Sequence, residues 1–207
     1  LGGDAYINTI KNLGASVEDP FVIWPESVEL YEKRKNQLTE IVAQRRQEEQ
    51  QWAEANPEKA AILEERFNNK LPNLPWNEIK QTPNAPTRNA SAACLTMLSE
   101  HVKNMIVSSA DLCNSDKTDG FLKHTTVITK DNFAGGFLQA GVSELTMACV
   151  CIGMTLHGGI ITAMGTFFVF SDYMKPAIRM AALMELPVKF VWSHDAFRVG
   201  EDGPTHE

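Results

Sequence analysis

Hydrophobic positions in the second half of the chain fall into short apolar runs that alternate with segments of helical spacing. From residue 88 onward this pattern predicts helices over 89–104, 143–156 and 171–185, and strands over 105–108, 137–142, 165–170 and 187–192. Strands separated by helices favour the α/β class, with a mostly parallel sheet and helices on both faces. Functional groups are then expected just beyond the carboxyl ends of the strands.

The first 87 residues have a different pattern. Residues 1–27 mix short apolar runs with Gly and Pro, and we expect them to be irregular. Between residues 27 and 69, apolar side chains recur at near-helical spacing among charged residues and Gln, which predicts two amphipathic helices broken near Asn56–Pro57. We therefore expect a helical linker over 1–87 and an α/β domain over 88–207, cut short at its C-terminal end in a piece of a longer protein.

Composition narrows the range of partners and compartments. The net charge of −7 and pI near 5.3 argue against nucleic acid, because phosphate binding needs a basic face. The four cysteines form no CxxC pair, and small buried thiols of a reducing compartment explain them best. We therefore expect a cytoplasmic protein.

A long uncharged segment, residues 145–171, has the length needed to span a bilayer. His157-Gly158-Gly159 interrupts it, and its flanks are Glu144 and Asp172 rather than Lys or Arg. A buried helix, a Gly-Gly turn and a buried strand explain the segment better, so we expect no membrane partner.

Acidic and imidazole side chains follow three of the predicted strands. Asp111 follows the first, Glu144 the second, and His194 with Asp195 the fourth. Each has an ordinary alternative explanation: Asp111 as a turn residue, and Glu144 as a first-turn carboxylate that complements a helix dipole after a Ser143 N-cap. Their joint placement at strand ends favours a functional site.

The segment after the last predicted strand is dense in titratable groups. His194 and Asp195 are followed by Glu201, Asp202 and His206. Glycines and a proline among them permit sharp turns, so that polar side chains can converge on a small volume.

Five motifs of the chain resemble, in order, those of the pyrimidine-binding domain of transketolases. They are Ser109-Ala-Asp-Leu112, Leu156-His-Gly-Gly159, Gly165-Thr-Phe-Phe-Val-Phe-Ser-Asp-Tyr173, Arg179-Met-Ala-Ala-Leu183 and Gly200-Glu-Asp-Gly-Pro-Thr-His206. Residues 1–87 resemble the segment that joins the family's diphosphate-binding domain to this one.

The resemblance implies thiamine diphosphate as cofactor and transfer of a two-carbon ketol unit from a ketose phosphate to an aldose phosphate, through an adduct on the cofactor. It further implies a homodimer with the active site at the subunit interface. The metal motif of thiamine enzymes, Gly-Asp-Gly followed by Asn, is absent, and Glu201-Asp-Gly203 does not replace it. We expect Mg²⁺ or Ca²⁺ to be bound by a diphosphate-binding domain outside this chain, and the chain alone to be inactive.

For the cofactor, the resemblance implies that Glu144 is the catalytic residue, which hydrogen-bonds the aminopyrimidine ring nitrogen. A carboxyl shielded from water can share a proton with such a weakly basic nitrogen. The other implied cofactor-binding residues are Asp111, Leu112, Phe167, Phe170 and Tyr173. Without the resemblance, these three aromatic side chains would ordinarily be assigned to the core.

For the substrate, the resemblance implies that Arg88, Ser115 and His194 bind the sugar phosphate, a use suited to a guanidinium fork and neutral donors. It also implies that Asp202 reads a substrate hydroxyl and that His206 lies near the reacting end of the donor.

The chain departs from the family pattern in two places. Ser143-Glu144-Leu145 replaces the usual Arg-Glu-His, and Asp195-Ala-Phe-Arg198 replaces the usual Asp-Ser-Ile-Gly. The first change leaves open a non-catalytic transketolase-like subunit kept for assembly or regulation. Dihydroxyacetone synthase and deoxyxylulose-phosphate synthase are related alternatives that share the domain.

Overall fold

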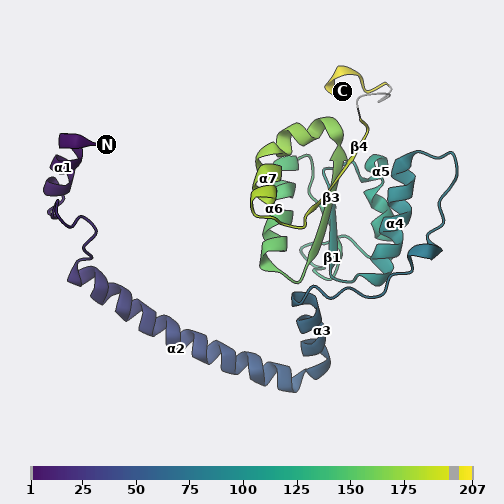
Figure 1. Ribbon diagram of the computed structural model, residues 1–207. Coiled ribbons are helices and arrows are strands. Elements are labelled where there is room, and N and C mark those ends of the chain that lie inside the picture. The colour runs from purple at the N-terminus through teal and green to yellow at the C-terminus, as the bar shows by residue number, and fades with distance from the viewer. Residues whose placement is uncertain (1, 196–200, 207) are drawn as a thin grey trace. The chain divides into compact units, whose positions relative to one another are not determined.

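The computed structural model describes residues 2–195 and 201–206, and it divides into two units (Figure 1). Residues 1–60 make one unit and residues 61–207 the other. Helix α3, Pro57–Phe67, begins in the first unit and ends in the second. None of the helices in the described residues combines the length and apolar character needed to cross a bilayer.

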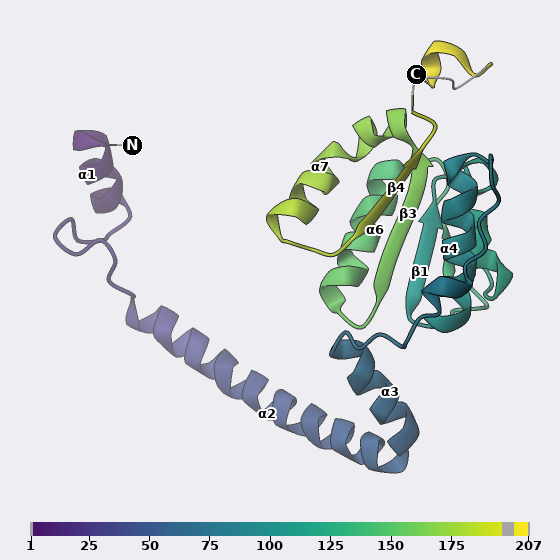
Figure 2. The same ribbon diagram turned by 45° about the vertical axis from the view of Figure 1, so that its right-hand side comes forward.

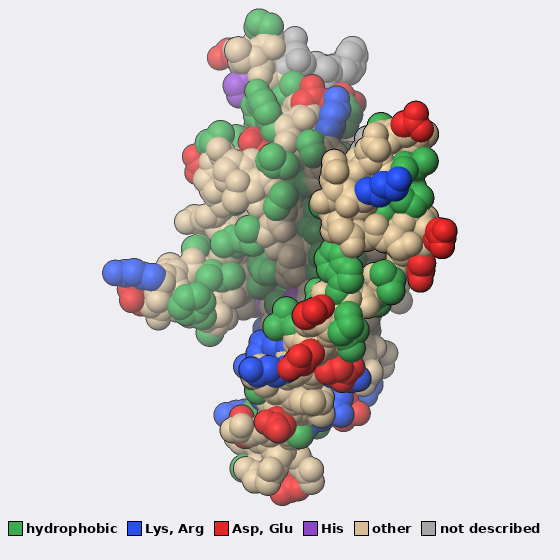
Figure 3. Space-filling view, turned by 90° about the vertical axis from the view of Figure 1, so that its left-hand side faces the viewer, with side chains coloured by type: hydrophobic (Ala, Val, Ile, Leu, Met, Phe, Trp, Pro, Cys, Tyr) green, Lys and Arg blue, Asp and Glu red, His purple; other side chains and the backbone are tan. Residues whose placement is uncertain are grey.

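The first unit is helical. It holds α1, Gly3–Asn12, and α2, Pro25–Ala55, whose surface mixes positive and negative side chains (Figure 3). The expectation that residues 1–27 are irregular is wrong for α1. Asp4 in its first turn and Lys11 in its last complement the helix dipole, which favours a helix here. The predicted break near Asn56–Pro57 is confirmed.

The second unit is the predicted α/β fold. Its elements after α3 are η1 (Trp76–Glu78), α4 (Thr87–His101), β1 (Met105–Ser109), α5 (Cys113–Asp116), η2 (Thr118–Lys123), β2 (Phe137–Gln139), α6 (Glu144–His157), β3 (Ile161–Phe167), η3 (Phe168–Phe170), α7 (Ser171–Leu183), β4 (Lys189–Ser193) and η4 (Gly203–Thr205). The four strands run parallel in the order β2-β1-β3-β4. The predicted parallel sheet is therefore confirmed.

The sheet lies between two layers of helices, with α6 and α7 on one face and α4 on the other (Figure 2). On one face α6 and α7 pack over a cluster that includes Met164, Met147 and Met174. On the other face α4 and the α5–η2 segment cover a cluster that includes Ala163 and Phe121. Consecutive residues of β3 thus enter opposite layers, as the two-residue period of a strand requires.

The observed bounds of β3 and β2 differ from those predicted. We expected a strand over 165–170, but β3 begins earlier, at Ile161, and ends at Phe167, and residues 168–170 form η3. Likewise β2 stops at Gln139, because the chain turns at Gly141, whose φ is 68°. These turns bring the residues that follow each strand back over the edge of the sheet.

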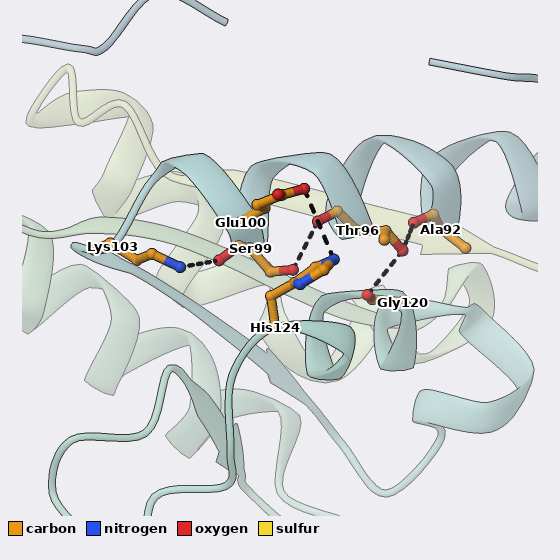
Figure 4. A network of polar contacts seen from close by, with 7 residues as sticks. All are labelled: Ala92, Thr96, Ser99, Glu100, Lys103, Gly120 and His124. Carbon is orange, nitrogen blue, oxygen red and sulfur yellow. Dashed lines mark hydrogen bonds and ion pairs between the residues drawn. The ribbon is translucent and has the colours of Figure 1, made fainter. Parts of the chain in front are cut away.

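A partly buried network of polar contacts joins helix α4 to η2 (Figure 4). The Thr96 hydroxyl oxygen lies 2.9 Å from the carbonyl oxygens of both Ala92 and Gly120, and its single proton is shared between them. The backbones meet closely here: a Cβ on Gly120 would lie 2.5 Å from the Ala92 carbonyl oxygen and 2.9 Å from its Cα. Only glycine fits at this crossing.

We therefore expect Gly120→Ala to lower the free energy of unfolding by about 1–3 kcal/mol, the usual cost of overpacking, because a backbone neighbour cannot move aside as a side chain can. Thermal and urea unfolding of the full-length protein would measure the change. Gly2→Ala, where an added Cβ would meet nothing within 4 Å, should leave the midpoint unchanged. Equal stability of the two variants would contradict the close approach.

Candidate active site

The carboxyl edge of the sheet carries a cavity of ≈ 500 Å³. It is lined by Ala110, Asp111, Leu112, Val142, Glu144, Phe170, Tyr173 and His206. These residues follow four different strands, so they come together only because parallel strands end at one edge. Six of them are candidates from the sequence.

Glu144 is the first residue of α6, and the turn before it fixes its position. The Ser143 backbone N–H donates to the Gly141 carbonyl at 2.8 Å, and the Ser143 hydroxyl donates to the Ala140 carbonyl at 2.7 Å. Ser143 therefore holds the turn rather than capping α6 with its side chain. The Glu144 side chain is only 7% exposed, and within the described part of the chain no hydrogen bond or ion pair satisfies its carboxylate.

The loop after β1 supplies the opposite wall. Asp111 has a φ of 64°, a left-handed conformation that turns the chain sharply past the strand end. The Leu112 backbone N–H donates to the Ser109 hydroxyl at 3.2 Å, and the Ser115 N–H donates to the Leu112 carbonyl at 2.8 Å. These bonds hold Leu112 at the cavity wall.

Aromatic rings form the third wall. Phe170 stacks between Phe167 and Tyr173, with ring centroids 6.0 and 6.2 Å apart, and the His206 ring meets Phe170 edge-on at 5.3 Å. Phe167 is buried beneath Phe170, whereas Tyr173 is 64% exposed. The rings therefore form a continuous ladder from the core to the open side of the cavity.

A second cluster adjoins the cavity through Phe167. The His194 ring stacks on Phe167 with centroids 3.9 Å apart, and its Nε2 contacts a terminal nitrogen of Arg88. The Ser193 hydroxyl lies 2.8 Å from His194 Nδ1. The Arg88 Nε is buried and has no hydrogen-bond partner among the described residues, so one donor of the guanidinium is unsatisfied.

The charges around His194 work against each other. Burial, and secondly the positive charge of Arg88, hold the pKa of His194 below its ordinary value, while the carboxylates of Asp202 and Asp116 act in the opposite direction. A dianion arriving at Arg88 would add a large negative charge and favour the protonated imidazole. This arrangement suits an anionic group of a ligand.

The remaining candidates lie at the margins. Asp202 is exposed on the segment that returns after residue 200, and Ser115 is half-buried on α5 but lies outside the cavity lining. The Asp195-Ala-Phe-Arg198 loop falls largely outside the described residues. Sequence reasoning missed Ala110 and Val142, which are apolar neighbours of candidate residues, and it missed the buried Asp116.

The cavity fits a flat, partly apolar heterocycle. Its rings and aliphatic side chains offer stacking surfaces, while the buried Glu144 carboxylate still has acceptor capacity for a donor on the ligand. Within residues 2–195 and 201–206, no cluster of three or more His, Cys, Asp or Glu side chains has the arrangement of a metal site.

Comparison with known proteins assigns this architecture. Residues 84–207 match the family model of the transketolase pyrimidine-binding domain. The whole chain is 37% identical to the transketolase of Halalkalibacterium halodurans, of which it covers 31%. Three quarters of the chain is 42% identical to the transketolase of Geobacillus stearothermophilus, of which 24% is covered. The chain thus spans about three tenths or less of these relatives.

Solved structures agree with these relatives. A transketolase from Leishmania mexicana matches 97% of the chain with a TM-score of 0.81 at 27% identity, and the chain covers 30% of it. A Pichia stipitis transketolase in complex with sedoheptulose-7-phosphate matches 95% with a TM-score of 0.79 at 29% identity, again over 30% of its length. This chain therefore belongs to the transketolase family, through a match to its pyrimidine-binding domain.

Proposed function

We propose that this chain supplies the pyrimidine-binding half of a thiamine-diphosphate-dependent active site that transfers a two-carbon ketol unit from a ketose phosphate to an aldose phosphate. The observation that carries the proposal is the buried Glu144 carboxylate, without a protein partner in the described residues, in a cavity with an aromatic wall. When bound, the cofactor supplies the carbanion-stabilising group of this reaction.

Glu144 would share a proton with a ring nitrogen of the cofactor. The residue is held at the start of α6 by the Ser143 turn, is only 7% exposed and lines the cavity, so a bound ring would displace the little solvent that reaches the carboxyl and could share a proton with it. Its neighbour Leu145 is apolar and brings no charge to the carboxylate. Proton exchange with the ring nitrogen would then depend on the Glu144 carboxyl alone.

The aromatic ladder and Leu112 would orient and dry the cofactor. Phe170 and Tyr173 present ring surfaces to the cavity, and Phe167 supports Phe170 from below. Leu112 gives the opposite wall a bulky apolar side chain, and Asp111 stands beside it at the cavity mouth. Together these residues would restrict the cofactor to one orientation.

Arg88, His194 and Ser115 would bind the phosphate of the sugar. The guanidinium of Arg88 lies against Nε2 of His194, which brings the two side chains to one place, and the Nε of Arg88 has no partner among the described residues. Asp202 and His206, on the returning segment, would contact the substrate closer to the reacting carbon. The sedoheptulose-7-phosphate bound to the Pichia stipitis relative supports this substrate class.

The remaining parts of the machinery would come from outside residues 88–207. We propose that residues 1–87 connect this domain to a diphosphate-binding domain, which holds the diphosphate and Mg²⁺ or Ca²⁺. All four cysteines are free thiols, which suits the reducing conditions of the cytoplasm.

A second copy of the chain would close the open side of the cavity. Val142, at the cavity mouth, is 79% exposed. Beside it the outer face of α6 presents Leu145, Val150 and Leu156 to solvent, with no charged side chain from residue 145 to 156. Figure 3 looks from the α6 and α7 side and shows hydrophobic side chains gathered there. Such a face suits a homodimer interface.

We expect Val150→Glu to weaken self-association of the full-length protein at least tenfold, because dimerisation would bury an unpaired charge. Sedimentation equilibrium would measure the dissociation constant. Leu183→Glu places the same charge at an exposed leucine at the end of α7 and serves as the control. Equal effects of the two substitutions would remove α6 from the interface.

The proposed function is tested by adding thiamine diphosphate and Mg²⁺ to the full-length protein and following the near-ultraviolet circular dichroism of the cofactor ring. Saturable binding together with ketol transfer from a ketose phosphate to an aldose phosphate supports the proposal. Binding without transfer would indicate the non-catalytic, assembly or regulatory subunit. The absence of binding would overturn the cofactor assignment.

A further inference from the structure

Asp116 is a buried carboxylate that the proposed reaction does not use. It is the last residue of α5 and only 1% of its surface is exposed. Its Oδ2 accepts the Ser109 hydroxyl at 2.7 Å, and its Oδ1 accepts both the Thr118 N–H at 2.8 Å and the Thr118 hydroxyl at 2.7 Å. Few carboxylates are buried so deeply without a functional or structural task.

The pattern of donors indicates that Asp116 is ionised. The Thr118 N–H can only donate, and the Ser109 oxygen already accepts the Leu112 N–H, which leaves its own proton for Asp116. Burial raises the pKa of the Asp116 carboxyl above its ordinary value, whereas the bonds from Thr118 and Ser109 oppose that shift. Three donated bonds replace the lost hydration of a carboxylate.

Part of this hydrogen-bond network holds the loop after β1 that carries Leu112. The bonds run from the Leu112 backbone to Ser109 and from Ser109 to Asp116, so the carboxylate anchors the residue that forms the cavity wall. The β3 backbone confines it further: a Cβ on Gly165 would lie 2.9 Å from Asp116 Oδ2 and 2.5 Å from Thr118 Cγ2. Asp116 therefore cannot shift toward β3.

The pKa of His194 reports on the charge of Asp116. Burial and, after it, Arg88 oppose the protonated imidazole, whereas the carboxylate of Asp202 and, after it, that of Asp116 favour it. Because Asp116 is buried and Asp202 is exposed, salt screens the effect of Asp116 less.

We propose that Asp116 is a positioning residue of the active site, whose buried, charged carboxylate anchors the Leu112 loop through Ser109 and ties that loop to Thr118 at the start of η2. This inference rests on the proposed function for the identity of the ligands. It assigns Asp116 no contact with cofactor or substrate.

The charge is tested with Asp116→Asn, which keeps the shape of the side chain. In the cofactor-free full-length protein, the His194 titration should move to lower pH because a negative charge that favours the imidazolium is lost. Carbon-13-labelled histidine read by NMR measures this titration, and the His194 signal is assigned by its loss in His194→Gln. The readout requires no turnover, so it can succeed or fail independently of the proposed reaction.

The anchor is tested with Ser109→Ala, which keeps the charge but breaks the link to Leu112. The dissociation constant of thiamine diphosphate should rise roughly 3- to 10-fold, as expected for one lost buried hydrogen bond, while the His194 titration stays in place. A raised dissociation constant with an unmoved His194 titration in Ser109→Ala would indicate a positioning role. A general loss of structure would change both quantities together.

Asp119→Asn is the matched control, because it removes a half-buried carboxylate three residues further along the chain. It should leave both the His194 titration and cofactor affinity unchanged. An unmoved His194 titration in Asp116→Asn would show that the Asp116 carboxyl carries no charge and would overturn the ionised anchor. If that variant fails to fold, unchanged cofactor affinity in Ser109→Ala still overturns the anchoring of the Leu112 loop.

Discussion

Glu144→Gln is expected to lower kcat of the proposed ketol transfer by the full-length protein by roughly 10²- to 10⁴-fold, the usual contribution of a positioned acid–base group, while cofactor binding changes little. Glutamine keeps the length and the acceptor oxygen of Glu144 but cannot take up or release a proton. The cavity that Glu144 lines keeps its other walls in this variant. Stopped assays of ketol transfer and dichroism titration of thiamine diphosphate measure the two quantities separately.

Two further variants test the reach of the Glu144 carboxyl and control for the chemical change. Glu144→Asp keeps the acid but is one methylene shorter, so it should recover only part of the lost rate. Glu185→Gln makes the same chemical change at an exposed carboxylate beyond the end of α7 and should leave kcat unchanged. Full activity of Glu144→Gln would remove the proton role that we assign to this residue.

Arg88→Ala is expected to have the second largest effect, a rise in KM for the sugar phosphate of roughly 10- to 100-fold with a much smaller change in kcat. Removing a charge-assisted hydrogen-bonding partner costs about 1.5–3 kcal/mol, which corresponds to this range. The loss falls on KM because the phosphate is remote from the reacting carbon and is bound equally in ground and transition states. Steady-state kinetics with a ketose phosphate measure both constants.

Arg88→Ala should also change the titration of His194. Arg88 lowers the pKa of that imidazole, so its removal should move the titration to higher pH, opposite in sign to the effect of Asp116→Asn. Arg179→Ala, on the exposed side of α7, is the control for lost positive charge. A normal KM in Arg88→Ala would place the phosphate elsewhere.

Local patterns in the sequence predicted most of the fold. The alternation of apolar runs with helical segments predicted a parallel sheet, because strand and helix periodicities depend on neighbouring residues alone. The prediction was wrong for α1 and for the ends of β2 and β3. In these places the outcome depended on turns and terminal charges, whose effects are small beside propensity and hard to weigh in advance.

The sequence allowed candidate residues to be selected, but it did not show which of them lie together in the structure. Asp111, Glu144 and His194 could be selected because each follows a predicted strand, and the resemblance added the aromatic side chains. Which of them share a cavity could not be read from spacing. His194 follows β4, yet it joins Arg88 of α4 and the ring of Phe167, because the strand order places β4 beside β3.

What the sequence alone determined is the set of chemical groups and the strand ends from which they project, since both follow from residue type and local periodicity. Only the tertiary structure decided that Glu144 is buried without a protein partner in the described residues, and that Asp116 lies beneath the loop that carries Leu112. Burial and hydrogen-bond partners depend on contacts between residues far apart in the chain, and those contacts exist only once the sheet has assembled.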